Sequence, residues 1–503
     1  MNIPWDAGLA RTIQFLLLPV LFVACLLVAT GHLLTVIAAV ICLVTLLPLL
    51  NRQPLDMFSP WTYLFYFVVL NIFVRSVFID FAIGGDDFDI SRIFYMDKPD
   101  GFLIESTVVM LVGFVFLTLG YLIPASKPRL LGLRIFRSGP VARRRFNRMI
   151  AFMIIISGVS LVAFIYVTFT GFGDFAIGML SRHRGLTTDL SEYRAHGYLR
   201  LLIGLASIVV YLAYARLRTT GRHDRRYLWT MFIVGTVITL TMSFYSQSRG
   251  ALIFIFLNIV FMKYYLDGRR FPWKVLSILA PIILALFFVT SAFRGGSGVS
   301  LNQEITAVRV VAPIILNNGG IDASKTGHII DYVDASQDYK FGQTLVQFIW
   351  AAVPRGMWTS KPVNLDTYIG EKVYGAETYG ASAVPPGFFA EMYMNFWYGG
   401  IVLGAFLLGM FMKYLANLLA GNRHNVNFIV CYVVTLQSIG MSVLASGVSS
   451  TIMGVLMSGI PLVIALNFVT PAQRRPVAVA PGGNYATGPI QQSSLLPAHD
   501  RAR

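Results

Sequence analysis

Long apolar runs alternate with short polar segments over almost all of the 503 residues. Each run is close to the ~20 residues that a helix needs to cross the hydrocarbon core of a bilayer. This pattern predicts an all-α polytopic membrane protein with about 12 transmembrane helices, in which residues 1–470 form the membrane domain. The predicted spans are 12–30, 32–50, 58–79, 102–123, 149–170, 198–217, 227–246, 250–266, 273–293, 387–412, 427–446 and 449–469.

The polar segments differ in charge, and this difference predicts how the spans are oriented. Segments 125–148, 216–226 and 267–274 are rich in Arg and Lys, and all three fall on one side of the twelve-span arrangement. Short basic loops stay in the cytoplasm. We therefore expect both termini inside the cell. The acidic segment 80–101 and the long loop 294–386 are then expected on the outer face of the cell membrane.

The composition narrows the class of protein further. Hydrophobic residues make up 56% of the chain and charged residues only 13%, well below the charged share of an average soluble protein. The formal net charge of +16 comes from basic residues in the loops that orient the spans, so no nucleic-acid partner is expected. The three cysteines lie within apolar runs, which argues against a disulfide framework or a thiolate metal site. Nucleotide-binding and HExxH motifs are missing from the sequence, and we expect neither a metal nor another cofactor.

The long loop 294–386 is not uniformly polar. Residues 303–318 place apolar side chains at helical spacing, and residues 342–353 are apolar but too short to span a bilayer. Both segments predict short interfacial or re-entrant helices that lie against the outer surface. In contrast, residues 471–503 are rich in Pro, Ala, Gly, Gln and Ser without apolar periodicity, which predicts a disordered cytoplasmic tail.

Five cations stand where they could bind an anionic ligand at the outer face. They are Arg75, Arg249, Arg294, Arg355 and Lys361. Arg75 lies near the outer end of its span, Arg249 and Arg294 have glycine neighbours at two span ends, and the last two follow the short apolar segment of the long loop. Glycine beside arginine lets backbone amides and a guanidinium approach a phosphate together. The alternatives are snorkelling of Arg75 or its ion pair with Glu105, and interfacial anchoring for Arg249 and Arg294.

Two groups are candidates for the general base of a reaction at this face. Glu391 opens the tenth span, and Asn395 and Tyr398 follow it on the same helix face. Such a carboxylate could take a proton from a substrate hydroxyl, or an arginine of a neighbouring span could neutralise it. His328 in the long loop is the second candidate, because imidazole titrates near neutral pH, and simple solvation is its alternative. Trp358 lies between two of the cations, an arrangement that suits a sugar phosphate.

The order of these motifs resembles that of a known family. PRGMWTSKP at 354–362 is followed by a Tyr- and Gly-rich loop and then by PPGFFAEMYMNFWYGGI at 385–401, which heads a span. SRGA at 248–251, Arg294 after the ninth span and a large late outer loop complete the layout. It resembles the Wzy-type oligosaccharide repeat unit polymerases, which are the O-antigen and exopolysaccharide polymerases of bacterial envelopes. The resemblance covers most of the chain.

The resemblance implies a multi-span glycosyltransferase of the bacterial cell (inner) membrane that acts in polysaccharide biosynthesis. Such an enzyme transfers a growing chain from undecaprenyl diphosphate to a new undecaprenyl-diphosphate-linked oligosaccharide. It needs no metal, and it acts beside a flippase and a chain-length regulator of the same pathway. The outer cations would hold the donor diphosphate, Glu391 or His328 would take the proton of the acceptor hydroxyl, and rings such as Trp358 would stack on sugars.

Three alternatives to a polymerase stay open from the sequence. An O-antigen ligase has a similar fold and donor but another acceptor. A polyprenyl-linked sugar transferase usually has a catalytic aspartate in its first outer loop, where this chain carries Asp80, Asp86, Asp87 and Asp89. A non-enzymatic flippase of lipid-linked oligosaccharides needs cations at mid-depth in the bilayer, whereas most of the membrane-proximal cations here are predicted near the outer face.

Overall fold

The secondary structure agrees with the predicted class. The computed structural model describes residues 32–50, 56–81, 101–125, 143–168, 197–219, 224–245, 249–268, 270–279, 281–282, 285, 320–351, 353, 357–358, 360–375 and 383–469. Every secondary-structure element within these ranges is helical. Nine helices in the described part of the chain are long and apolar enough to cross a membrane. The protein is therefore an all-α polytopic membrane protein, as the sequence predicted.

The nine candidate spans keep the predicted order along the chain. They are α2 (Leu33–Leu50), the helix formed by α3 (Pro60–Val68), η1 (Val69–Val74) and α4 (Arg75–Asp80), α6 (Gly101–Leu122), α7 (Arg143–Thr168), α9 (Gly197–Thr219), α10 (Arg225–Tyr245), α17 (Phe388–Asn422), the helix formed by α18 (Val426–Cys431), η4 (Tyr432–Leu436) and α19 (Ile439–Ser446), and α20 (Val448–Val469).

The total of 12 spans stays a prediction. The span predicted at 12–30 lies outside the described residues, and the one at 273–293 lies only partly within them. The span predicted at 250–266 corresponds to α11 (Arg249–Leu266), which is not among these nine candidates. The predicted tail 471–503 also lies outside the described residues.

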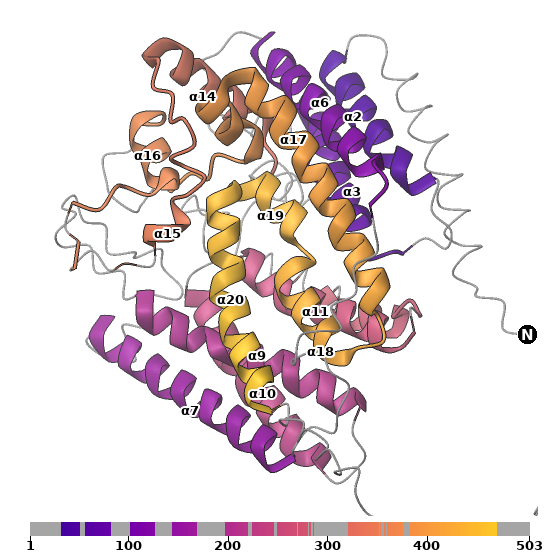
Figure 1. Ribbon diagram of the computed structural model, residues 1–503, viewed down its shortest axis with the longest axis vertical. Helices are drawn as coiled ribbons and strands as arrows, with labels where there is room; N and C mark the ends of the chain where they lie inside the picture. The colour runs from indigo at the N-terminus through magenta and orange to yellow at the C-terminus, as the bar shows by residue number, and fades with distance from the viewer. Residues whose placement is uncertain are drawn as a thin grey trace, which may run out of the picture.

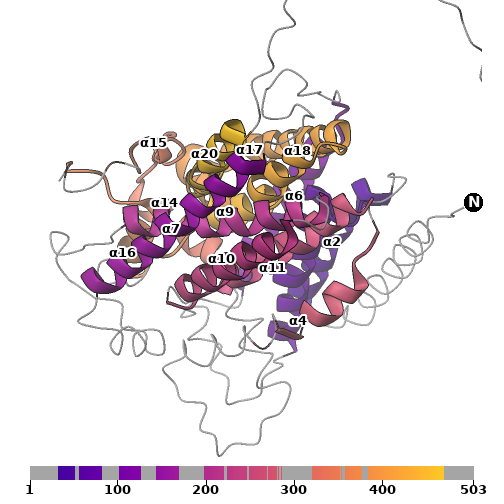
Figure 2. The ribbon, with the colours of Figure 1, turned by 90° about the horizontal axis from the view of Figure 1, so that it is seen from below.

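The helices form two groups that meet along α20. In Figure 1, α2, α3 and α6 lie beside α17, whereas α7, α9 and α10 form the opposite side of the molecule. Figure 2 shows α7, α9, α10 and α11 side by side. Glycines let α6 and α17 approach closely: a Cβ on Gly120 would lie 2.0 Å from the carbonyl oxygen of Phe406, and one on Gly409 would lie 2.0 Å from that of Leu117. Small residues at such crossings allow backbones to pack directly.

Three short helices cover one end of this bundle, and we call them the roof. They are α14 (Ala323–Ser336), α15 (Phe348–Ala351) and α16 (Leu365–Lys372), which lie to the left of α6, α17 and α20 in Figure 1. Asp322 caps α14 by accepting hydrogen bonds from the first backbone N–H groups of that helix. Gly327 lets α14 lie directly on α6, because a Cβ there would be 2.0 Å from the Ser106 hydroxyl.

The roof differs from the helices that the sequence predicted in the long loop. The apolar segment 342–353 folds mainly as turns at 341–347 followed by the four-residue α15, which is shorter than the predicted helix. The helix predicted at 303–318 lies outside the described residues. The pattern did not predict α14 or α16, because short roof helices with mixed polarity lack the long apolar run that marks a span.

The long helix α17 is broken near its start. Phe396 and Trp397 have non-helical backbone angles, with φ −145° and ψ 23° at the first and φ 56° and ψ −153° at the second. A Cβ on Gly404 would lie 3.3 Å from a ring atom of Phe388, although a straight helix would separate these residues by about 24 Å. Residues 388–395 therefore fold back against the helix that follows. The break also separates Tyr398 from the face that the sequence assigned to it with Glu391.

Candidate functional site

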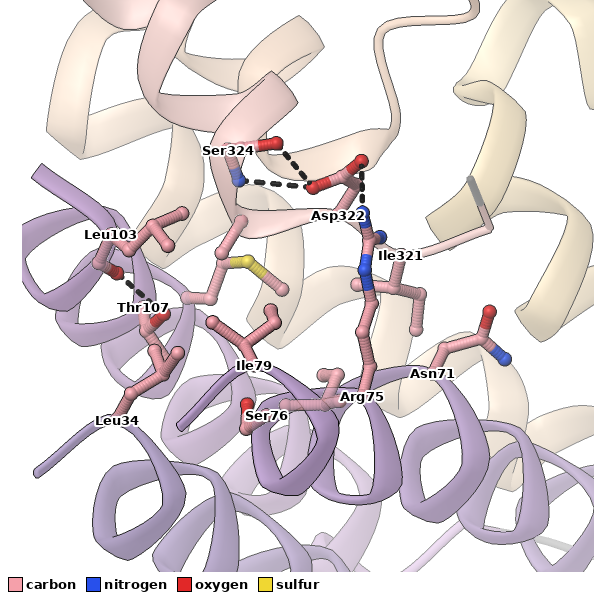
Figure 3. Close-up of a pocket in the computed structure, with 13 residues that line it drawn as sticks. Leu34, Asn71, Arg75, Ser76, Ile79, Leu103, Thr107, Ile321, Asp322 and Ser324 are labelled. Atoms are coloured by element: carbon pink, nitrogen blue, oxygen red, sulfur yellow. Dashed lines mark hydrogen bonds and ion pairs between the residues drawn. The ribbon is translucent and has the colours of Figure 1, made fainter. Parts of the chain in front are cut away.

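A buried ion pair joins a candidate span to the roof. Arg75 is the first residue of α4, and Asp322 stands at the start of α14 (Figure 3). A guanidinium nitrogen lies 3.1 Å from a carboxylate oxygen, and both side chains are largely buried. The other carboxylate oxygen accepts hydrogen bonds from the Ser324 backbone N–H at 3.0 Å and from its hydroxyl at 2.8 Å. The sequence did not indicate Asp322 as a partner of Arg75.

A small pocket lies beside this ion pair, between the roof and the bundle (Figure 3). Its lining combines polar and apolar side chains from both: Leu34, Asn71, Ile72, Arg75, Ser76, Ile79, Leu103, Thr107, Met110, Ile321, Asp322, Ala323 and Ser324. Arg75 directly follows η1, a π-helical turn, and such widened turns occur frequently at functional sites. Charged side chains at membrane depth usually face a cavity or a partner. Arg75 lines the pocket and also pairs with Asp322.

Two more charged residues extend the cluster through the roof. Burial lowers the pKa of Lys325 on α14 to about 8, although the charge of Asp322 acts in the opposite direction. Burial raises the pKa of Asp366 on α16 to about 6, against the charge of Lys325 and a hydrogen bond with Ser450. For Asp322, burial favours a higher pKa, but the charges of Arg75 and Lys325 and its hydrogen bonds bring the pKa below its usual value.

Sequence reasoning missed Lys325, Asp322 and Asp366. The available signal was local: an Asp that precedes Ala-Ser-Lys has the composition of a helix N-cap followed by a first turn. That signal predicts the start of α14, but it does not predict that the side chains of its first turn are buried against other helices. Burial of the lysine is therefore a result of the tertiary packing.

Glu391 lies in a second cluster, where the roof meets α17 and α20. Its side chain is only 1% exposed. One carboxylate oxygen accepts a hydrogen bond from the Thr344 hydroxyl at 3.1 Å, and the other accepts one from the Val448 backbone N–H at 2.5 Å. Because Val448 begins α20, the carboxylate caps that helix and lies at the favourable end of its dipole. These contacts give Glu391 a structural role, and its role as a base stays a prediction.

Asn395 completes the same cluster, as its spacing from Glu391 predicted. Its amide oxygen accepts a hydrogen bond from the Gly342 backbone N–H at 2.7 Å. Its amide nitrogen donates to the Thr344 hydroxyl at 2.6 Å and to the Glu391 carbonyl at 2.7 Å. The side chain is fully buried. Asn395 therefore ties the turns at 341–347 to the first part of α17, rather than facing solvent as a ligand-binding amide would.

The remaining described candidates also contact protein groups. The Lys361 ammonium donates to the carbonyl oxygens of Ala351 and Val353, each at 2.8 Å, and so binds the end of α15. Trp358 is partly exposed, and its indole N–H donates to the Ser360 hydroxyl at 2.9 Å. His328 packs against two aromatic rings, with centroid distances of 4.9 Å to Phe102 and 5.9 Å to Tyr374.

Three of the predicted cations have no described side-chain geometry. Arg294 and Arg355 lie outside the described residues, and Arg249 begins α11 but its side chain is likewise not described. Among the residues that the structure describes, no group of three or more His, Cys, Asp or Glu side chains could hold a metal ion. We call the buried charged residues Arg75, Asp322, Lys325, Asp366 and Glu391 the scaffold.

Comparison of the chain with protein-family models, with curated proteins and with solved structures finds no match. Chemically, the scaffold brings two cations and three carboxylates, Arg75, Lys325, Asp322, Asp366 and Glu391, out of water at one end of the membrane helices. Such an arrangement can hold a charged ligand or transfer a proton, since burial brings the pKa of Lys325 down to about 8 and that of Asp366 up to about 6.

Proposed function

We propose that this protein is a membrane glycosyltransferase that joins undecaprenyl-diphosphate-linked oligosaccharide repeat units into a surface polysaccharide at the outer face of the cell membrane. The observation that supports this most directly is the charged scaffold beneath the roof, at one end of the candidate spans. Ionisable groups at membrane depth are costly, and they occur mainly where a function requires them. A lipid-linked diphosphate carries its charge and its sugars at the same depth.

The described and undescribed candidates have different parts in this proposal. Glu391 and Asn395 bind the turns at 341–347, and Lys361 binds the end of α15, so these residues hold the site in shape. Arg249, Arg294 and Arg355 remain the candidates for binding the donor diphosphate, because guanidinium groups pair with phosphate oxygens in bidentate fashion. A cation at the diphosphate also stabilises the negative charge that develops as it leaves.

The proposed reaction is a substitution at the anomeric carbon of the donor. The acceptor hydroxyl oxygen forms the new bond to that carbon, and undecaprenyl diphosphate leaves with the electron pair of the broken carbon–oxygen bond. The hydroxyl proton passes to a base, for which Glu391 and His328 are the sequence candidates. Since Glu391 is buried under the roof, it could act as the base only after the roof has opened.

A genetic test separates this function from two of its alternatives, the flippase and the ligase. In host cells that lack the protein, a polymerase defect should leave surface glycolipid with a single repeat unit in place of long chains. A flippase defect would export no units, and a ligase defect would leave polymer on undecaprenyl diphosphate. Chain length is read on a gel, and the lipid-linked intermediates are identified by mass spectrometry. Either of the last two phenotypes refutes the polymerase.

The cations can then be tested one at a time in the complemented cells. Arg355→Ala should abolish long chains without loss of folded protein, because its proposed partner is the substrate. The matched control is Arg144→Ala, which removes an exposed arginine of the predicted cytoplasmic side. Normal ladders in Arg355→Ala at wild-type expression would remove this residue from the proposed site.

A further inference from the structure

Large aromatic side chains gather where α17 is broken, next to the turns that precede α15. The exposed ones are Phe341 (78% exposed), Phe396 (50%), Trp397 (56%) and Tyr398 (43%). We call these four residues the aromatic face. They come from two segments that lie together, because a Cβ on Gly342 would be 3.4 Å from a ring atom of Phe396. The Trp397 and Tyr398 rings are also in contact, with centroids 5.2 Å apart.

Carboxylates and hydroxyl groups border the aromatic face. Asp334, an exposed residue of α14, accepts hydrogen bonds from the Tyr393 hydroxyl at 2.6 Å and from the Tyr339 hydroxyl at 3.2 Å. The ring of Tyr339 lies 6.3 Å from that of Phe341. The ring of Tyr393 lies 5.0 Å from that of Tyr398. Tyr339 therefore connects the Asp334 carboxylate to Phe341, and Tyr393 connects it to Tyr398.

A second carboxylate lies on the same border. Asp338 accepts two hydrogen bonds from the Lys340 ammonium, each at 2.7 Å, and another from the Tyr368 hydroxyl. The same ammonium lies 4.3 Å from the centroid of the Tyr368 ring. We call Asp334, Asp338 and Lys340 the polar rim. Its formal charge is −1, so it favours a neutral ligand over an anionic one.

Backbone geometry shows that the fold imposes the exposure of these rings. Among the described residues, the non-glycine residues with positive φ are Gln337 (54°), Phe341 (44°) and Trp397 (56°), and all three lie in this region. Positive φ is unfavourable for bulky residues, and such conformations persist only where surrounding contacts enforce them. Two backbone contacts fix the region: the Lys340 N–H donates to the Met394 carbonyl at 2.8 Å, and the Gly342 N–H donates to Asn395.

We propose that the aromatic face and the polar rim bind a neutral oligosaccharide. The flat rings would stack on the apolar CH faces of pyranose rings, and the rim would exchange hydrogen bonds with sugar hydroxyls. The main alternative is an aromatic anchor in the membrane–water interface. Carboxylates beside the rings favour the saccharide, because Asp334 and Asp338 would lose hydration in a lipid environment. The identification of this oligosaccharide as the lipid-linked repeat unit rests on the proposed function. The binding of a neutral oligosaccharide to this surface does not depend on that function.

Glycine variants test the rings without disturbing the backbone. Trp397→Gly and Phe341→Gly remove the aromatic side chains, and glycine accepts positive φ without steric cost. The full-length protein in nanodiscs is applied to an array of neutral and acidic bacterial oligosaccharides, and Kd is measured by saturation-transfer NMR for the glycans that bind. We expect each variant to weaken binding by about tenfold, which equals about 1.4 kcal/mol.

The matched control is Trp273→Ala, which removes another exposed tryptophan, 59% exposed. Trp273 contacts Phe271, and Phe271 stacks on Phe58, which precedes α3 at the end of that span far from Arg75. This variant should bind the glycans as the wild type does. Thermal unfolding of all variants reports whether each is folded.

Two results would overturn the proposal: no glycan binding by the wild type, or unchanged binding in both glycine variants. The outcome is independent of the transfer reaction. Glycan binding without repeat-unit polymerisation would keep the saccharide surface and refute the polymerase. Polymerisation that survives in variants without glycan binding would keep both the saccharide surface and the polymerase, and would show that this surface does not hold the substrate of the transfer reaction.

Discussion

Substitution of Glu391 by glutamine tests whether this carboxylate is a structural group or a base. The carboxylate accepts hydrogen bonds from Thr344 and from the Val448 N–H. A glutamine amide has one acceptor oxygen and two N–H donors. If that oxygen faces Val448, the amide nitrogen can donate to the Thr344 hydroxyl oxygen, which already accepts from Asn395. The Thr344 hydroxyl proton then has no acceptor.

The expected cost follows from these contacts. A buried donor without an acceptor destabilises by about 1–3 kcal/mol. Loss of the negative charge at the start of α20 adds about 0.3–1 kcal/mol. At pH 8, Glu391→Gln should therefore open the roof more often, while the long spans stay folded, because the broken contacts join only the roof, the first part of α17 and the start of α20.

Limited trypsin digestion measures this opening directly. The roof contains Lys325 in α14 and Lys372 in α16 as cleavage sites. Cleavage at these sites should rise at least about 5-fold, because each kcal/mol of destabilisation multiplies the open population about fivefold. Glu105→Gln is the control, because Glu105 is exposed. Equal cleavage in wild type, control and variant would refute the structural role. Lost polymerisation without added cleavage would instead support Glu391 as the base.

Three further variants test the packing and the charges. Gly409→Val should prevent assembly of the bundle, because a Cβ at this position already meets the Leu117 carbonyl at 2.0 Å; a normal gel-filtration peak would contradict this. Arg75→Met leaves Asp322 buried without its ion-pair partner and should destabilise by about 3–5 kcal/mol, whereas Arg75→Met with Asp322→Asn should recover part of this in thermal unfolding. Lys325 has a folded-state pKa of about 8 against 10.5, so the unfolded chain binds more protons between these values, and wild-type stability should rise with pH there relative to Lys325→Met. A flat difference in unfolding temperature from pH 8 to pH 10 would contradict it.

The sequence determined the class of protein and the position of most helices. A bilayer leaves the backbone no water to bond, so an apolar run of about 20 residues must be a helix whatever surrounds it. For that reason nine of the predicted spans coincide with described helices between α2 and α20. Local spacing also determined that Glu391 and Asn395 lie one turn apart, and they share one cluster. These features depend on neighbours within a few residues.

The tertiary structure alone decided which distant groups meet. Arg75 and Asp322 are 247 residues apart in the chain, and Glu391 and Val448 are 57 apart. The spacing of residues along the chain does not predict such partners, because the packing of the roof on α6, α17 and α20 determines which residues meet. The break at Trp397 is of the same kind: its positive φ is locally unfavourable, and it persists because contacts from Lys340 and Gly342 hold the two segments together.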